Sequence, residues 1–460
     1  MNISIAIIFH LLSVHGLIVA FGLLVYVLTT HAMQQRRSAT AAVAWVLAIA
    51  LVPYLGLPLY LIFGKRKLAH RRNRTADAAS DLRLGDAWAR QLAASMGQPP
   101  VASYRGLRIH ADGSQALESL WEVIDRAENQ LVLCTFIIGR DPMGDALVKR
   151  LIDKANSGIH VRLLLDGVGR MMGGRLDLHK LKAAGVHVTI FAPILNGLFQ
   201  NRANLRNHRK MVVADGSHLW CGGRNFSAEY FEGAHGRMPW KDASFDLQGP
   251  LAAQAQDLFE RDWALACGTP GPICKHDATN AQEPFAQVIA SGPDQTDDTV
   301  HDLLVTACFK AKNRIMAVTP YFVPSQALLM ALTLAARRNV KVELILPKKS
   351  NHRLADLVRH RALREFAQAG GNVWQVPYMS HAKVFVMDDN LALCGSANLD
   401  SRSLFLNYEL MVAFYATDDV KRFASIGDAH RATAELYQSK KPGLLRDFTE
   451  GFVLWLGFQL

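Results

Sequence analysis

The stretch Asn207–Asp215, NHRKMVVAD, decides the fold, because it returns as SHAKVFVMD at Ser380–Asp388. The chemically active members of the two copies match in identity and in spacing: His208, Lys210 and Asp215 in the first, His381, Lys383 and Asp388 in the second. Each copy then carries two small residues and an asparagine at the same distances, namely Gly222, Gly223 and Asn225, and Gly395, Ser396 and Asn398. A duplication in register predicts two copies of one structural unit that share one site.

Each copy combines an imidazole, an ammonium and a carboxamide. His and Lys stand two residues apart before an apolar run, so on a strand they project from the same face. The Gly-Gly or Gly-Ser step before each asparagine allows the backbone to come close to a ligand. Two facing copies suit a phosphodiester: Lys and Asn carry the negative oxygens, one His attacks phosphorus and the other protonates the leaving oxygen.

A metal site is the alternative interpretation of the His and Asp residues. Lysine is not a ligand at neutral pH, and the chain has neither an H-E-x-x-H nor a C-x-x-C motif. Two lysines supply the charge that a metal otherwise would, so we expect no metal and no other cofactor.

The doubled motif resembles the signature of the phospholipase D superfamily, and the likeness extends over nearly the whole chain. The flanking segments resemble those of bacterial cardiolipin synthases: WKDASFDLQGP at 240–250, DW at 262–263, SGPD at 291–294, TPYFVP at 319–324 and GSANLDSRSLFLNYE at 395–409. This resemblance implies phosphatidyl transfer from one phosphatidylglycerol to another, which gives cardiolipin and glycerol through a phosphohistidine.

The resemblance also implies roles for the residues. We expect His208 to be the nucleophile and His381 the acid and then the base. Asp215 and Asp388 close the catalytic motifs, and we expect them to place the lysine or the strand turn rather than to touch substrate. The residues expected to hold the phosphoryl oxygens are Lys210, Lys383, Asn225 and Asn398.

Catalytic imidazoles need carboxylates that orient them. Asp242 and Glu409 follow the two asparagines at corresponding places, in WKD and NYE. We therefore expect Asp242 to orient His208 and Glu409 to orient His381, each within its own half.

Apolar strands alternate with amphipathic helices in both halves, which predicts an α/β fold: two tandem phospholipase D-type sheet repeats that face each other. A segment rich in Gly and Pro separates them. The predicted division is a transmembrane hairpin with a basic flank (1–75), a first repeat (76–267), a linker (268–284), a second repeat (285–440) and an amphipathic C-terminal tail (441–460).

The N-terminal segment reads as a two-helix hairpin. Residues 3–29 are almost wholly apolar and long enough to cross a bilayer, and residues 39–63 form a second span. Pro53, Gly56 and Pro58 lie in the second span and kink it or make it re-entrant. Basic residues are more numerous after the second span than between the spans, so we expect a multi-pass protein of the bacterial inner membrane with a cytoplasmic catalytic domain.

The net charge of +11 suits an anionic partner. Six basic residues gather in KRKLAHRRNR at 65–74, directly after the apolar segment, which favours contact with anionic membrane lipid. The catalytic half has no conspicuous basic stripe with aromatic residues, so a nucleic acid partner is not expected.

The cysteines and the tail leave alternatives open. Cys134, Cys221, Cys308 and Cys394 stand in apolar contexts typical of a core, whereas Cys267 and Cys274 flank a loop and could pair if oxidised. The tail at 444–460 has apolar residues at helical spacing and either lies on the membrane or docks on the protein.

Other functions use the same residues. A phospholipase D that hydrolyses phospholipids to phosphatidic acid, or another phosphatidyltransferase, would carry the same motifs. A nuclease of the superfamily would not need membrane helices, and a non-catalytic adaptor would not keep both motifs intact. The membrane segment and the TPYFVP and RSLFLNYE segments favour the synthase.

Overall fold

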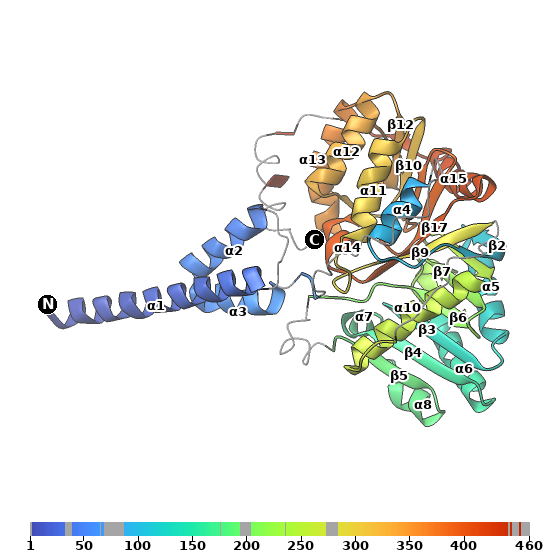
Figure 1. Ribbon diagram of the computed structural model, residues 1–460, viewed down its shortest axis with the longest axis horizontal. Helices are drawn as coiled ribbons and strands as arrows, with labels where there is room; N and C mark the ends of the chain where they lie inside the picture. Colours follow the sequence, from blue (N-terminus) through green and yellow to red (C-terminus); the bar gives the residue numbers. More distant parts are fainter. Residues whose placement is uncertain are drawn as a thin grey trace.

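The computed structural model describes residues 2–32, 39–64, 66–68, 87–174, 176–193, 204–234, 236–272, 284–439, 442–443 and 450–451. The N-terminal helices project from one side of a larger body that contains both sheets (Figure 1). The basic segment at 65–74 and the C-terminal tail lie mostly outside the described residues.

The N-terminal segment differs from the predicted hairpin of two spans. Its elements are α1 (Asn2–Ala32), α2 (Ala39–Leu51) and α3 (Pro53–Phe63). Within the described residues one helical stretch, Ser13–His31, is long and apolar enough to cross a membrane. The expected second span is broken before Pro53, which cannot donate to the preceding helical turn.

The turn between α2 and α3 depends on a glycine. A Cβ on Gly56 would lie 2.4 Å from the carbonyl oxygen of Ala48, so only glycine lets the two short helices approach this closely. The second apolar stretch is therefore a bent helical pair, and the expectation of a multi-pass protein is corrected to one candidate span.

The first half of the larger body forms a seven-stranded sheet in the order β2-β8-β7-β6-β3-β4-β5. Strands β3, β4 and β5 are parallel, and their neighbours are antiparallel. The parallel strands are nearly continuous runs of buried apolar residues, as expected where helices cover the sheet. The elements are β2 (Arg105–His110), α5 (Gly113–Asp125), β3 (Gln130–Thr135), α6 (Pro142–Asn156), β4 (His160–Asp166), α7 (Gly167–Met172), α8 (Leu178–Ala183), β5 (His187–Phe191), β6 (Met211–Ala214), β7 (His218–Gly222), the 3₁₀ helix η2 (Ala228–Tyr230), β8 (Ser244–Gln248) and α10 (Pro250–Cys267).

The second half repeats this topology in a nine-stranded sheet of order β1-β9-β17-β15-β14-β10-β12-β13-β18. Again three strands, β10, β12 and β13, are parallel and the strands from β14 to β9 are antiparallel. The elements are β9 (Phe285–Ser291), α11 (Thr299–Lys310), β10 (Arg314–Val318), β11 (Phe322–Val323), α12 (Gln326–Arg337), β12 (Lys341–Pro347), α13 (Arg353–Gln368), β13 (Asn372–Val376), β14 (Val384–Met387), β15 (Leu391–Gly395), β16 (Leu399–Asp400), α14 (Ser401–Phe405), β17 (Glu409–Phe414), α15 (Thr417–Arg431) and β18 (Glu435–Leu436). The predicted α/β fold of two matching sheets is confirmed.

One segment crosses between the halves. Helix α4 (Trp88–Ser95) and strand β1 (Ala102–Ser103) precede the first sheet in the chain, yet β1 pairs with β9 and α4 packs in the core of the second half. The predicted first repeat, which begins at residue 76, therefore includes a helix and a strand that pack with the second half. The other predicted boundaries stay predictions.

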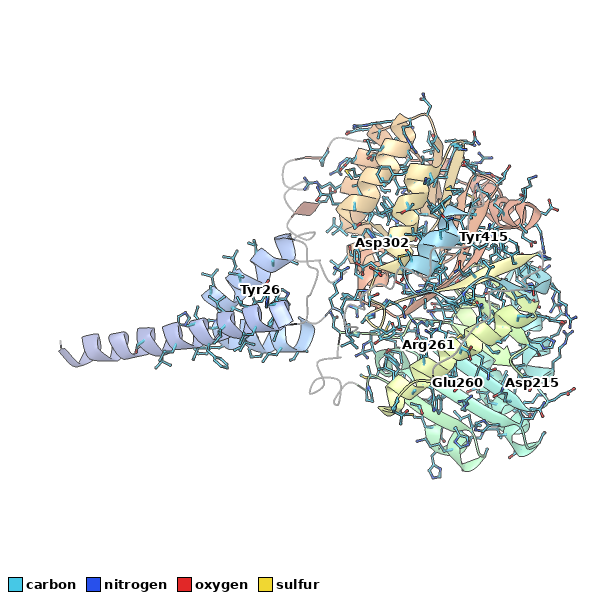
Figure 2. The ribbon with its side chains drawn as sticks, viewed as in Figure 1. Tyr26, Asp215, Glu260, Arg261, Asp302 and Tyr415 are labelled. Carbon is cyan, nitrogen blue, oxygen red and sulfur yellow. The ribbon has the colours of Figure 1, made fainter. Side chains whose placement is uncertain are left out.

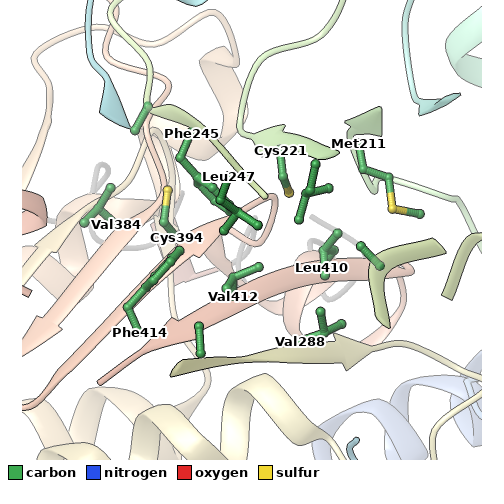
Figure 3. Packing of buried hydrophobic residues seen from close by; sticks show 14 of the residues in the cluster. Met211, Cys221, Phe245, Leu247, Val288, Val384, Cys394, Leu410, Val412 and Phe414 are labelled. Carbon is green, nitrogen blue, oxygen red and sulfur yellow. The ribbon is translucent and has the colours of Figure 1, made fainter. Parts of the chain in front are cut away.

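The two halves share one hydrophobic core (Figure 3). Phe245 of β8 contacts Phe414 of β17, with ring centroids 5.2 Å apart. Cys221 and Cys394, which occupy equivalent places in the two motifs, are both buried in this core. With Cys134 and Cys308 they confirm the expected core cysteines, whereas Cys267 is free and exposed and Cys274 lies outside the described residues.

Candidate active site

The backbone of each catalytic-motif histidine is hydrogen-bonded to the backbone of the opposite half. The amide of His208 donates to the carbonyl oxygen of Tyr408 at 2.9 Å, and the amide of His381 donates to that of Lys241 at 2.6 Å. The first hydrogen bond joins the segment before β6 to the segment before β17, and the second joins the segment before β14 to the segment before β8. The two motifs therefore lie together between the sheets, as the duplication predicted.

The orienting carboxylates come from the opposite halves. His208 Nδ1 lies 3.1 Å from Glu409 Oε1, and His381 Nδ1 lies 2.7 Å from Asp242 Oδ2. The predicted pairing was therefore wrong, because it assumed that each half is self-contained. The backbone of His208 lies beside Tyr408, and the residue after Tyr408 is Glu409, which therefore reaches the His208 imidazole. In the same way His381 lies beside Lys241, and the next residue, Asp242, reaches the His381 imidazole.

The two carboxylates are fully buried and are held differently. Ser396 Oγ donates to Glu409 Oε2 at 2.5 Å, and Asn407 Nδ2 donates to Oε1 at 3.2 Å. At the place equivalent to Ser396, Gly223 leaves room for Asp242, since a Cβ there would lie 2.3 Å from its Oδ1. The second residue of each Gly-Gly or Gly-Ser pair thus determines how the neighbouring carboxylate is held.

Both carboxylates remain ionised despite their burial. Burial opposes ionisation, but the charge of Lys383 and the hydrogen bond with His381 outweigh it and lower the pKa of Asp242. In the same way His208 and Lys210 lower the pKa of Glu409 against the effect of burial. Each carboxylate can therefore fix its imidazole with the proton on Nδ1, which leaves Nε2 for chemistry.

Both lysines are buried, and within the described part of the chain neither amine forms an ion pair with a carboxylate. Lys210 Nζ donates to the carbonyl oxygen of His208 at 2.7 Å, and Lys383 Nζ makes the equivalent bond to His381. Burial lowers the pKa of Lys210 to about 8 and that of Lys383 to about 7. An anion between these ammonium groups would restore the charge that burial disfavours.

Burial and nearby charge hold both imidazoles neutral. Burial and then the charge of Lys383, whose Nζ lies 3.0 Å from Nε2, lower the pKa of His381 to about 3. Burial and then Lys210 lower the pKa of His208. The charge of each lysine also reaches the histidine of the other half, which shows that the two motifs form one electrostatic unit.

Aromatic rings enclose the imidazoles, and the motif search did not identify them. Tyr230 and Trp240 lie against His381, with ring centroids 5.1 Å and 5.8 Å away, and Phe136 lies 5.1 Å from His208. Trp240 stands two residues before Asp242 in the WKD segment, so its position was readable from the sequence. The positions of Phe136 and Tyr230 beside the imidazoles could be seen only in the folded structure.

Asn225 and Asn398 are both buried, and their role stays a prediction. Asn225 Nδ2 donates to the hydroxyl of Tyr230 at 2.8 Å. Both Asn225 and Asn398 are buried, and among the described residues their Oδ1 atoms have no hydrogen-bond partner.

Asp215 and Asp388, which close the two motifs, hold backbone turns in the structure. The carboxylate of Asp215 accepts the backbone N–H groups of residues 128–130, each at 2.8 Å, and Asp388 accepts those of residues 312–314 at 2.8–3.0 Å. They fix the turns that lead into β3 and β10 rather than the lysines. Asp215 lies at the end of the molecule remote from the N-terminal helices (Figure 2).

Among the described residues no group of three or more His, Cys, Asp or Glu side chains is arranged to hold a metal ion. The positive charge of the site comes from Lys210 and Lys383. Arg209 directly precedes Lys210 in the chain and is fully buried, but its guanidinium binds Asp262 and backbone carbonyls instead.

Comparison with known proteins agrees with this geometry. Residues 120–263 and 304–429 match the family described as cardiolipin synthase, PLD-like domain, and residues 18–65 match the phospholipase D-nuclease N-terminal family. Cardiolipin synthase A of Pseudomonas aeruginosa is 31% identical over 417 residues, which cover 86% of this chain and 85% of that protein. Cardiolipin synthase A of Pseudomonas fluorescens is 32% identical over 403 residues, 83% of this chain and 84% of that protein.

A solved structure shares the fold. Phosphatidylserine synthase of Haemophilus influenzae superposes with a TM-score of 0.62 at 13% identity, over 81% of this chain and 98% of that chain.

Proposed function

The chain belongs to the family of phospholipase D-like cardiolipin synthases, and from this premise and the geometry of the site we propose how it transfers a phosphatidyl group between two phosphatidylglycerol molecules. The observation that carries the proposal is the crossed pair of dyads, His208 with Glu409 and His381 with Asp242. The two buried lysines can bind the oxygens of one phosphodiester. The two oriented imidazoles can serve the entering and the leaving alcohol.

In the first step, Nε2 of neutral His208 attacks the phosphorus of the donor lipid. The bond between phosphorus and the headgroup glycerol oxygen breaks, and His381 gives that oxygen a proton, so that glycerol leaves. The phosphatidyl group remains on His208 through a phosphorus–nitrogen bond. The greater exposure of the His208 side chain, 14% against 5% for His381, supports its role as nucleophile, because phosphorus must reach it from outside.

The acid of the first step must gain its proton when substrate binds. In the ligand-free protein His381 is neutral because of burial and Lys383. The phosphodiester brings a negative charge to the same place and gives Lys383 a partner other than the imidazole. Both changes raise the pKa of His381 toward the range in which it can act as an acid.

In the second step, a headgroup hydroxyl of the second phosphatidylglycerol attacks the phosphohistidine. His381, now neutral, takes the hydroxyl proton, the phosphorus–nitrogen bond breaks, and cardiolipin is released. Lys210 and Lys383, with Asn225 and Asn398, stabilise the phosphoryl oxygens in both steps. Hydrolysis to phosphatidic acid is the same sequence with water in place of the second lipid.

The N-terminal helix supports a membrane location for this reaction. The stretch Ser13–His31 is the candidate span, and it exposes large apolar side chains such as Leu17 and Phe21. Both substrates are lipids, so an anchored enzyme meets them at the bilayer surface. Cytoplasmic placement of the catalytic body at the bacterial inner membrane, contact with anionic lipid and the lack of a nucleic acid partner are parts of this proposal.

Product analysis tests the function. Purified full-length protein in detergent–phosphatidylglycerol micelles should form cardiolipin and free glycerol in equal amounts, with little phosphatidic acid. The Lys383→Met variant keeps the apolar stem, removes the cation and should lose turnover. Phosphatidic acid as the main product would show a hydrolase instead, and no phosphorus-containing product would refute phosphatidyl transfer.

A further inference from the structure

Residues 66–68, which we call the strap, leave the N-terminal helices and lie on the loop 292–298 between β9 and α11. Arg66 Nη2 contacts Asp298 Oδ2 at 2.5 Å, and Lys67 Nζ lies 3.1 Å from Asp298 Oδ1. These side chains are 11–14% exposed, so water screens the ion pairs less than on an open surface. Two cations from the basic segment expected on lipid thus bind the protein.

Backbone contacts fix the strap in register. Lys67 Nζ donates to the carbonyl oxygens of Gly292 and Asp297, at 3.1 Å and 2.9 Å. The amide of Leu68 donates to the carbonyl oxygen of Pro293 at 2.8 Å, and its side chain packs against the shared core. A chain that served only as a tether would not need matched contacts at three successive residues.

The strap also touches the helix that precedes Glu409. The guanidinium of Arg66 lies over the ring of Phe405, 4.2 Å from its centroid, at the end of α14. This cation–π contact adds to the ion pair with Asp298.

The loop under the strap contacts the residues that position His208. Arg209, the next residue in the chain, donates to the carbonyl oxygen of Ser291 at 3.2 Å and lies 3.7 Å from Asp294. Its Nε donates to the carbonyl oxygen of Glu409 at 3.0 Å, and the Glu409 carboxylate binds His208. One buried guanidinium therefore joins the loop to the His208–Glu409 dyad.

A second contact runs through Tyr408. A Cβ on Gly292 would lie 3.2 Å from the Cα of Tyr408, so the loop packs directly on this backbone. The carbonyl oxygen of Tyr408 is the acceptor for the amide of His208. A shift of the loop would move both the carbonyl and the guanidinium that hold the His208 segment.

We propose that the strap is a positioning element of the active site: by clamping the loop 292–298, it ties the membrane anchor to the geometry of His208. The anchor then does more than hold the enzyme at the bilayer. Release of the strap should lower turnover of the membrane-bound enzyme. The effect on turnover rests on the proposed function, whereas the effect on His208 geometry does not.

The test compares two full-length variants in phosphatidylglycerol-containing liposomes. Arg66→Ala/Lys67→Ala removes the strap contacts, and Arg71→Ala/Arg72→Ala removes two charges from the same basic segment. Flotation measures membrane binding, product analysis measures kcat, and hydrogen exchange measures the peptide that contains His208. We expect the strap variant to float, to lose about three- to tenfold in kcat and to exchange faster at the His208 peptide, while the control keeps the wild-type kcat per membrane-bound enzyme and the wild-type exchange.

Several outcomes would overturn the proposal. Unchanged kcat and exchange in the strap variant would mean that the contacts are incidental. Equal losses in both variants, in proportion to membrane binding, would mean that only charge near the lipid matters. If the strap variant does not fold, Lys67→Met and Asp298→Asn replace it, and their effects on exchange should be non-additive because both remove the Lys67–Asp298 ion pair; fully additive effects would refute the coupling. A wild-type enzyme without phosphatidyl transfer refutes the function, but the exchange comparison still tests the strap.

Discussion

Glu409 of the second half binds Nδ1 of His208 of the first half at 3.1 Å. The matching bond from His381 to Asp242 crosses in the opposite direction. Neither half therefore contains a complete histidine–carboxylate dyad. The duplicated fold makes one active site, and the interface between the sheets is part of the chemistry.

The crossed dyads predict separable defects in the carboxylate variants. With a nitrophenyl phosphodiester, whose leaving group needs little acid, Glu409→Gln should slow nitrophenolate release about 10²-fold, because His208 loses its orienting anion. Asp242→Asn should spare that first step and slow turnover of the natural lipid. Stopped-flow absorbance measures the release. If Asp242→Asn instead abolished the burst and Glu409→Gln kept it, the roles of the two histidines would be reversed.

Anion binding should be linked to proton uptake. Lys383 and Lys210 have pKa values of about 7 and about 8 in the ligand-free protein, lowered by burial. A bound anion raises both values, so the complex holds more protons and tungstate binding should tighten as the pH falls from about 8.5 to about 6.5. Calorimetry in buffers with different ionisation enthalpies measures the uptake. Binding without dependence on buffer or pH would contradict the burial of the two ammonium groups.

Asp215→Ala should destabilise the fold without changing the chemistry. The substitution leaves three backbone N–H groups of residues 128–130 without their acceptor, at a cost of roughly 2–4 kcal/mol. Backbone hydrogen bonds lower the Asp215 pKa against the effect of burial. This stabilisation is thus present above the unfolded pKa, near 3.8, and is lost as the pH falls through the lower folded value. Thermal unfolding at pH 7 measures the loss of stability, and product analysis at low temperature measures kcat. A lower kcat for the folded variant would show that Asp215 takes part in catalysis.

Much of the fold and site was readable from the sequence because the information is local. Alternating apolar residues and the fixed spacing of His and Lys depend on strand geometry, which predicted the sheets and the shared site. The burial of Cys221 and Cys394 likewise follows from their place on β7 and β15.

The errors concern contacts between distant segments. The pairing of carboxylate with histidine depends on which strand-entry segments run side by side, and spacing within one half does not contain that information. The docking of Arg66 on Asp298 also joins residues that are far apart in the chain, so the basic segment was assigned to lipid. Pro53, Gly56 and Pro58 were expected to kink the second span or make it re-entrant, but the expected span at 39–63 is a bent pair of short helices.

The most direct test of the central claim is the site of the covalent intermediate. The His381→Ala variant is mixed with a lipid nitrophenyl phosphodiester, quenched under alkaline conditions that preserve phosphohistidine, digested and mapped by mass spectrometry. We predict one nitrophenolate released per enzyme and a phosphatidyl group on His208, with no adduct in the His208→Ala variant. An adduct on another residue, or a full burst with no covalent species, would contradict transfer through His208.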